Sequence, residues 1–109
     1  MRTLKFIVDG QIIKQDPDCD FSGLVPGTEG YLKAEFKFSN DWNGCAKAAG
    51  FFSKLGKEYT PQILEDGESC IIPSEVLKKS EFQIKIVGKS DSVSLTTNKV
   101  LVKQNGGVL

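Results

Sequence analysis

The sequence predicts an all-β domain, and three observations lead to that prediction. Two Asp-Gly pairs, Asp9-Gly10 and Asp66-Gly67, each stand between short apolar runs. Residues 31–39 alternate apolar and polar side chains with the period of two that is typical of a strand. Only one short segment, residues 73–79, has helical character. Together these patterns favour an antiparallel β-sandwich or a Greek-key barrel of about seven or eight strands with one short helical connector.

Each Asp-Gly pair predicts a β-hairpin. A two-residue type I′ turn needs positive φ at both central residues, which Gly adopts freely and Asp better than most residues. Strand-like runs flank the first pair at residues 3–8 and 11–14, and the second pair at residues 58–64 and 69–72. We therefore expect hairpins that close at Asp9-Gly10 and at Asp66-Gly67.

The first half of the chain holds two alternating strands, residues 3–8 and 31–39, each with one dry face and one wet face. Between them, residues 15–30 combine Asp, Ser, Pro and Gly in turn-forming order and predict a long irregular segment. The residues of these three segments that we expect in the core are Leu4, Phe6, Val8, Phe21, Leu24, Val25, Leu32, Ala34, Phe36 and Phe38.

The second half supplies the remaining strands. Residues 46–53 predict a strand in which Gly50 marks a bulge or a close approach, and Pro61 places residues 58–64 at a sheet edge. In residues 73–79, an early Pro and Glu and two late Lys suit a short helix. Residues 81–87 alternate again, with Phe82, Ile84 and Ile86 aligned on one face, and residues 88–91 form a turn. Residues 92–97 and 99–103 complete the sheets.

The length of 109 residues predicts one domain, residues 1–104, followed by a flexible tail at residues 105–109. A chain of this size buries roughly 65% of the surface that its unfolded form exposes, which is enough for one core. The hydrophobic content of 39% suits a globular domain. We expect no parallel pairing, because parallel strands need long crossovers and the sequence has no helical ones.

Charge and hydropathy narrow the classes of partner. Fourteen basic and fourteen acidic residues cancel, so the chain lacks the basic surplus of most nucleic-acid-binding proteins. Zero net charge also removes one barrier to self-association. The apolar run at the N-terminus is too short for a signal peptide, and no run is long enough to span a membrane. We expect no nucleic acid and no membrane partner, and synthesis in the cytoplasm of the producing cell.

The three cysteines, Cys19, Cys45 and Cys70, are widely spaced and form no Cys-x-x-Cys motif. Their odd number does not fit a disulfide framework, and a zinc site would need Asp or Glu ligands because histidine is absent. We expect reduced thiols that are buried or half-buried. A redox or metal role is the alternative.

No candidate catalytic set emerges from the sequence. The absence of histidine removes Ser-His-Asp and Cys-His catalysis, and most acidic residues fall in turns. Asp16, Asp18 and Asp20 have the spacing of the first calcium ligands of an EF-hand, but the following Gly and the final Glu are missing, so Asx-turns are favoured. The glycines never take a phosphate-binding order. We expect no catalytic, cofactor-binding or metal-binding residue and no enzymatic activity.

Aromatic residues offer two alternatives. Trp42 is either a core aromatic or a stacking platform for a sugar, a base or a partner. Phe51 and Phe52 place rings on both faces of one strand, so one ring belongs in the core. We expect the other ring under a loop or at a subunit contact.

Two blocks along the chain carry a family resemblance. Residues 36–44 read Phe-Lys-Phe-Ser-Asn-Asp-Trp-Asn-Gly, and residues 73–77 read Pro-Ser-Glu-Val-Leu. With the runs at residues 4–9, 30–35, 47–51, 70–72 and 94–100, the sequence resembles small phage and prophage domains of Gram-positive bacteria, typified by the N-terminal domain of baseplate upper proteins. The resemblance covers nearly the whole chain.

The resemblance implies an immunoglobulin-like β-sandwich that builds part of a virion and has no enzymatic activity. Members of that family usually continue into a stalk, fibre or receptor-binding head, whereas this sequence ends at Leu109. The implied function is therefore that of a tail or baseplate component, a capsid decoration or a small adaptor. Its partners are other phage structural proteins and itself, as a homo-oligomer. The alternatives are an inhibitor of a host defence system and a carbohydrate-binding module with Trp42 and Tyr31 as platforms.

Overall fold

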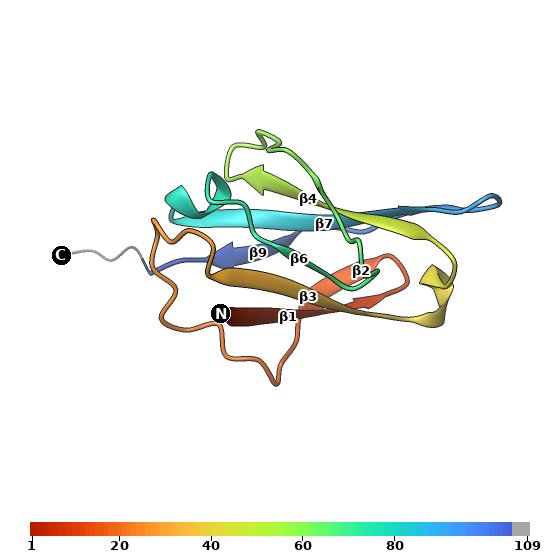
Figure 1. Cartoon of the computed structure of the whole chain (residues 1–109), viewed down its shortest axis with the longest axis horizontal. Helices are drawn as coiled ribbons and strands as arrows, with labels where there is room; N and C mark the ends of the chain where they lie inside the picture. Colours follow the sequence, from red (N-terminus) through yellow and green to blue (C-terminus); the bar gives the residue numbers. More distant parts are fainter. Residues whose placement is uncertain (106–109) are drawn as a thin grey trace.

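The computed structural model describes residues 1–105 of the chain, and nine strands in two sheets make up this part (Figure 1). The strands are β1 (Arg2–Asp9), β2 (Ile12–Gln15), β3 (Leu32–Phe38), β4 (Ala46–Ser53), β5 (Gln62–Ile63), β6 (Ser69–Ile71), β7 (Glu81–Lys89), β8 (Ser94–Thr96) and β9 (Val100–Lys103). Two single 3₁₀ turns, η1 (Asn40–Trp42) and η2 (Val76–Lys78), join them. The all-β prediction is confirmed, and the expected helical connector is reduced to the turn η2.

The first predicted hairpin is confirmed, although its turn is shifted by one residue. Strands β1 and β2 pair antiparallel with Asp9 opposite Ile12, so Gly10 and Gln11 form the two-residue loop. Gly10 has a φ of +58°, and every residue with positive φ in residues 1–105 is a glycine. The expectation of a type I′ turn with Asp9 at positive φ is therefore wrong. Positive φ at the first central residue alone fits a type II′ turn.

The expectation of purely antiparallel sheets is also wrong, because β1 and β3 pair in parallel from Arg2↔Leu32 to Val8↔Phe38. The connection between β2 and β3 returns the chain to the start of β1 without a helix. Its backbone is fixed at both ends, since Asp16 N donates to Lys5 O at 3.0 Å and Arg2 N donates to Tyr31 O at 2.8 Å.

Apolar side chains anchor this connection to the core, as the sequence predicted for two of three residues. Leu24 is buried, and the Phe21 ring meets the Phe6 ring edge-on at 5.4 Å. Val25, which we expected in the core, is 49% exposed. The anchors stabilise a crossover whose turn-rich sequence gives no sign of parallel pairing.

The second predicted hairpin does not form. Strand β5 pairs with β4 and β6 pairs with β3, so the chain crosses from one sheet to the other between them. Asp66 and Gly67 lie in a tight turn in which Gly67 N donates to Leu64 O at 2.9 Å. The Asp66-Gly67 pair thus forms a turn that connects the two sheets. The local sequence does not distinguish such a turn from a hairpin turn.

The five-stranded sheet has the order β5-β4-β7-β8, and β9 also pairs with β7. Strands β8 and β9 lie along the same edge of β7. Val87 pairs with Thr96 and Ile84 with Val100, so three residues on one strand oppose two on the other. The extra residue is a bulge at Thr97, which pairs with Ile86 through its backbone N–H and its Oγ1, both at 3.0 Å.

The bulge joins the two sheets along one flank. It turns Asn98 toward β2, where Asn98 Oδ1 accepts from Ile13 N at 2.8 Å and Asn98 Nδ2 donates to Ile13 O at 3.4 Å. Two glutamines add to this seam, because Gln15 Nε2 donates to Leu101 O and Gln11 Nε2 to Thr96 O. These side-chain bonds, with one backbone bond from Asn98 N to Gln11 O at 3.1 Å, take the place of a ladder between the edge strands β2 and β9.

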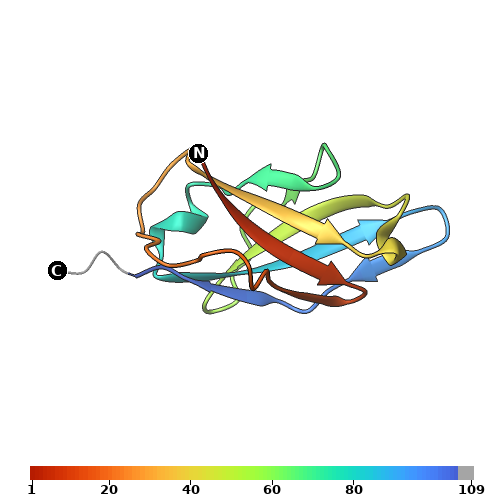
Figure 2. The same ribbon diagram turned by 90° about the horizontal axis from the view of Figure 1, so that it is seen from below.

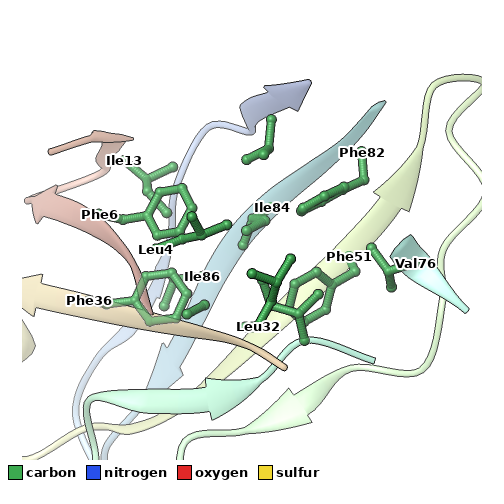
Figure 3. Packing of buried hydrophobic residues seen from close by; sticks show 14 of the residues in the cluster. Leu4, Phe6, Ile13, Leu32, Phe36, Phe51, Val76, Phe82, Ile84 and Ile86 are labelled. Atoms are coloured by element: carbon green, nitrogen blue, oxygen red, sulfur yellow. The ribbon is translucent and has the colours of Figure 1, made fainter. Parts of the chain in front are cut away.

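The core lies between the sheets, whose strands cross at an angle when seen from below (Figure 2). Inward side chains of both sheets meet there (Figure 3). They include the predicted residues Leu4, Phe6, Val8, Leu32, Ala34, Phe36, Phe51, Phe82, Ile84 and Ile86, all buried. Phe38 is half-buried against this cluster. The tail expected from residue 105 lies outside the described residues apart from Asn105, whose N–H donates to Leu24 O at 2.6 Å.

Trp42 packs against the backbone of β7 at Gly88. Trp42 is fully buried, and its Nε1 donates to Gly10 O at 2.8 Å. A Cβ on Gly88 would lie 2.6 Å from the Trp42 ring. We expected a turn at Gly88, but β7 continues through it to Lys89, because the missing side chain makes room for the indole.

We predict that Gly88→Ala destabilises the fold by about 1–3 kcal/mol or more, because the added methyl overlaps the indole and β7 cannot move away without losing its ladders. Urea denaturation followed by Trp42 fluorescence measures the change. Gly50→Ala, where the added Cβ would meet only the Phe52 ring at 3.2 Å, is the matched control with a smaller cost. Equal costs for the two variants would contradict the packing described for Trp42.

We predict that Asn98→Ala costs about 1–3 kcal/mol, because it leaves the backbone groups of buried Ile13 without their partners. Asn43→Ala, at an exposed position after η1, should change the free energy of unfolding by less than about 0.5 kcal/mol. A cost for Asn98→Ala as small as that control, measured in the same urea titration, would mean that the seam contributes nothing to stability.

Candidate interaction surface

The described residues contain no assembled metal site. Residues 1–105 hold no group of three or more Cys, Asp or Glu side chains that could bind a metal ion. Cys19, Cys45 and Cys70 are free and half-buried, as the sequence predicted. Burial raises the pKa of the Cys70 thiol to about 12, and the negative charge of Asp66 adds to this. Cys70 therefore stays protonated at neutral pH and is a poor nucleophile.

Two of the three carboxylates with the spacing of calcium ligands accept hydrogen bonds within local turns instead. Asp16 Oδ1 accepts from Asp18 N at 2.9 Å, and Asp20 Oδ1 accepts from Ser22 N at 2.8 Å. These bonds are the Asx-turns that the sequence favoured. The hydrogen bonds from Ser22 also lower the pKa of Asp20, and nearby Arg2 contributes.

The aromatic platforms expected for carbohydrate binding do not assemble. Trp42 is fully buried with its Nε1 bonded inside the protein, so it cannot stack on a ligand, and of the two alternatives for this residue the core aromatic is confirmed. Tyr31, the residue before β3, is 50% exposed, but with Trp42 buried it is left as a single platform. A carbohydrate-binding module thus loses one of its two proposed platforms.

Phe52 points outward from the five-stranded sheet but is not exposed. Phe51 fills the core, whereas Phe52 is covered by lysine side chains, with Lys99 Nζ 4.0 Å and Lys85 Nζ 5.4 Å from the ring centroid. Such cation–π contacts hold the ammonium groups against the sheet. The ring is therefore the base of a positively charged area rather than an apolar contact itself.

An apolar hollow lies beside this charged area on the same outer face. Cross-strand pairs align Ile63 of β5, Ala48 of β4, Val87 of β7 and Thr96 of β8 in one row. Directly paired residues of an antiparallel sheet share a face, so these side chains and that of Ala46 point outward together. We call the five residues the apolar trough. It has a volume of about 400 Å³.

The shape of the trough follows from side-chain size. Ala46 and Ala48 form its floor, while Ile63 (71% exposed) and Val87 (38% exposed) stand on either side. Lys89 and Ser94 stand at its end. An exposed sheet face normally carries polar side chains, so the apolar walls of this hollow depart from the usual pattern.

The outer face of the other sheet, whose order is β2-β1-β3-β6, mixes charged and apolar side chains. Its charged residues are Lys5, Lys14, Lys33, Glu35 and Lys37, and its apolar residues are Ile7, Ile12 and Ile71. Ile12 is 61% and Ile71 44% exposed, so this face is not purely polar either. The apolar trough lies on the five-stranded sheet.

Sequence reasoning left the partner-binding residues open and did not find the trough. Its members come from four separate segments, and their pairing in one row depends on register that no local pattern reveals. One signal was available: Ala46 and Ala48 occupy alternate positions of a predicted strand where an exposed face would carry charge.

No family model matches the chain, and no curated protein matches it. In the part of the chain that the structure describes, no helix has the length and apolar character needed to cross a membrane. The interpretation of the surface therefore depends on its own geometry and on the resemblance described above.

Asp66 fixes the segment that follows Ile63. Its carboxylate accepts from Ser69 Oγ at 2.6 Å, Ser69 N at 2.7 Å and Glu68 N at 2.9 Å. These bonds, that from Ser69 Oγ foremost, lower the pKa of Asp66 from 3.8 to about 2. The turn sets the point at which the chain leaves the trough wall for β6.

We predict that Asp66→Asn lowers stability at pH 7 and that its difference from wild type shrinks as pH falls. The folded pKa is below the unfolded value, so the contribution of the carboxylate is complete above about pH 4 and is lost as pH approaches about 2. Urea midpoints at several pH values measure this. Asp18→Asn, whose carboxylate has no such set of donors, is the control. A pH-independent difference for Asp66→Asn would contradict the linkage.

Proposed function

We propose that this protein is a non-enzymatic structural or accessory component of a phage particle that acts through protein–protein contacts. We also propose that its two sheets form an immunoglobulin-like β-sandwich. The observation that carries the proposal is the apolar trough, a hollow with mainly apolar walls on the outer face of the five-stranded sheet. The resemblance of residues 36–44 and 73–77 to phage baseplate domains supports the virion setting.

The trough suits a contact between proteins better than a small-molecule site. It is open, it lies on a regular sheet, and apolar carbon dominates its walls. Small ligands usually need several convergent polar groups for orientation, whereas protein interfaces combine an apolar centre with a polar rim. Lys89 and Ser94 supply such a rim.

The same surface would also serve the alternative of an inhibitor that binds one host protein. Both functions need an exposed apolar contact on a rigid domain, so the identity of the partner separates them. A structural component is present in many copies in the particle, whereas an inhibitor is recovered with one host enzyme. The proposal favours the first because of the family resemblance.

We predict that mass spectrometry of purified particles finds the chain in many copies and that Val87→Glu removes it from them. Glu at position 87 places a charge in the trough without disturbing the core, because Val87 faces outward. Gln83→Glu, on the same face of β7 but outside the trough, should be retained in the particles.

Two outcomes would contradict the proposal. Wild-type protein that is absent from particles and recovered with a single host enzyme would support the inhibitor instead. Equal retention of the Val87→Glu and Gln83→Glu variants would mean that the trough is not the contact surface. Circular dichroism of both variants checks that each is folded.

A further inference from the structure

The zero net charge of the chain hides an opposition between its two layers. Residues 1–45 and 64–72, which form the four-stranded sheet and its connections, hold ten acidic and five basic residues. Residues 46–63 and 73–105, which form the five-stranded sheet and its connections, hold four acidic and nine basic residues. The layers therefore carry formal charges of −5 and +5.

The positive charge includes the lysines beside the trough. Lys85, Val87 and Lys89 alternate on one face of β7, and Lys99 shares the Phe52 ring with Lys85. Two copies that meet trough to trough would bring all of these ammonium groups together. That like-charge juxtaposition disfavours a symmetric contact between the two basic faces.

The negative charge is concentrated in connections, above all in the one from β2 to β3. This connection projects beyond β1, away from β4 and β7 (Figure 1). It carries Asp16 and Asp18, and its Asx-turn and the bond from Asp16 N to Lys5 O hold it in shape. Pro17 and Val25 on the same connection are exposed and supply apolar side chains beside the carboxylates.

We infer that the apolar trough is covered by the acidic β2–β3 connection of a second copy of this chain, arranged head to tail. The connection with Asp16 and Asp18 of one copy lies toward Lys85 and Lys89 of the next. This inference takes from the proposed function only that the trough is an interface, and it names the partner. A contact between two different surfaces repeats, so it builds a ring when its rotation closes and a filament when it does not.

Sedimentation velocity of the full chain tests this inference. The wild type should self-associate in low salt, and its dissociation constant should rise by about tenfold or more between about 0.05 M and 0.5 M NaCl, which shortens the screening length roughly threefold. The variants K85E/K89E and D16N/D18K should each be monomeric, because each now opposes like charges. Their equimolar mixture should associate again, since both of its alternating contacts are complementary.

A matched control and two contrary outcomes complete the test. K54E/K78E changes the charge of the basic layer as much as K85E/K89E does, but at the other end of β4 and β7, and should associate like the wild type. A wild type that is monomeric at every salt concentration would overturn the inference. Association that does not weaken with salt, or a mixture that stays monomeric, would also overturn it. Retention of wild-type protein and loss of Val87→Glu from particles would then leave the proposed function standing.

Discussion

The contact between the Trp42 indole and the backbone at Gly88 fixes how the two sheets sit on each other. Trp42 lies in η1, where the chain crosses from β3 to β4, and its Nε1 holds the β1–β2 turn through Gly10 O. Its ring occupies the space left by the missing side chain of Gly88 and lies 5.3 Å from the Phe38 ring. The Trp42 side chain thus contacts the β1–β2 turn, the crossing between the sheets and the longest strand, β7. This packing sets the relative position of the two sheets and therefore of their outer faces.

The strands that carry strict alternation could be predicted from the sequence, because burial of one face imposes a period of two. Leu4, Phe6 and Val8 in β1 and Phe82, Ile84 and Ile86 in β7 are all buried as expected. These features follow from local chemistry alone.

Pairing partners could not be predicted in the same way. The parallel partnership of β1 and β3 depends on an irregular crossover held by Leu24 and Phe21, and the separation of β5 from β6 depends on which sheet each joins. Gly88 resembled a turn residue because the sequence does not reveal the indole that approaches it. The trough escaped prediction for the same reason, since its row exists only after four strands are in register.

Composition also gave no information about how charge is distributed over the surface. A formal net charge of zero does not reveal that most acidic residues lie in the connections around one sheet, while nine of the fourteen basic residues belong to the other sheet and its connections. Folding therefore separates the opposite charges of the sequence between two parts of the molecule. Ala46 and Ala48 of β4 face outward, and their small side chains form the floor of the trough beside Ile63 and Val87.

The Asn98 amide has a consequence for solubility. Strand β2 is an edge strand that exposes Ile12, and an edge of this kind is a template on which a foreign strand can add and start aggregation. The outward N–H and C=O of Ile13 are the groups that such a strand would have to pair with, and Asn98 already occupies both. The Asn98 side chain thereby blocks the addition of a foreign strand along this edge, and with it the aggregation that such addition starts.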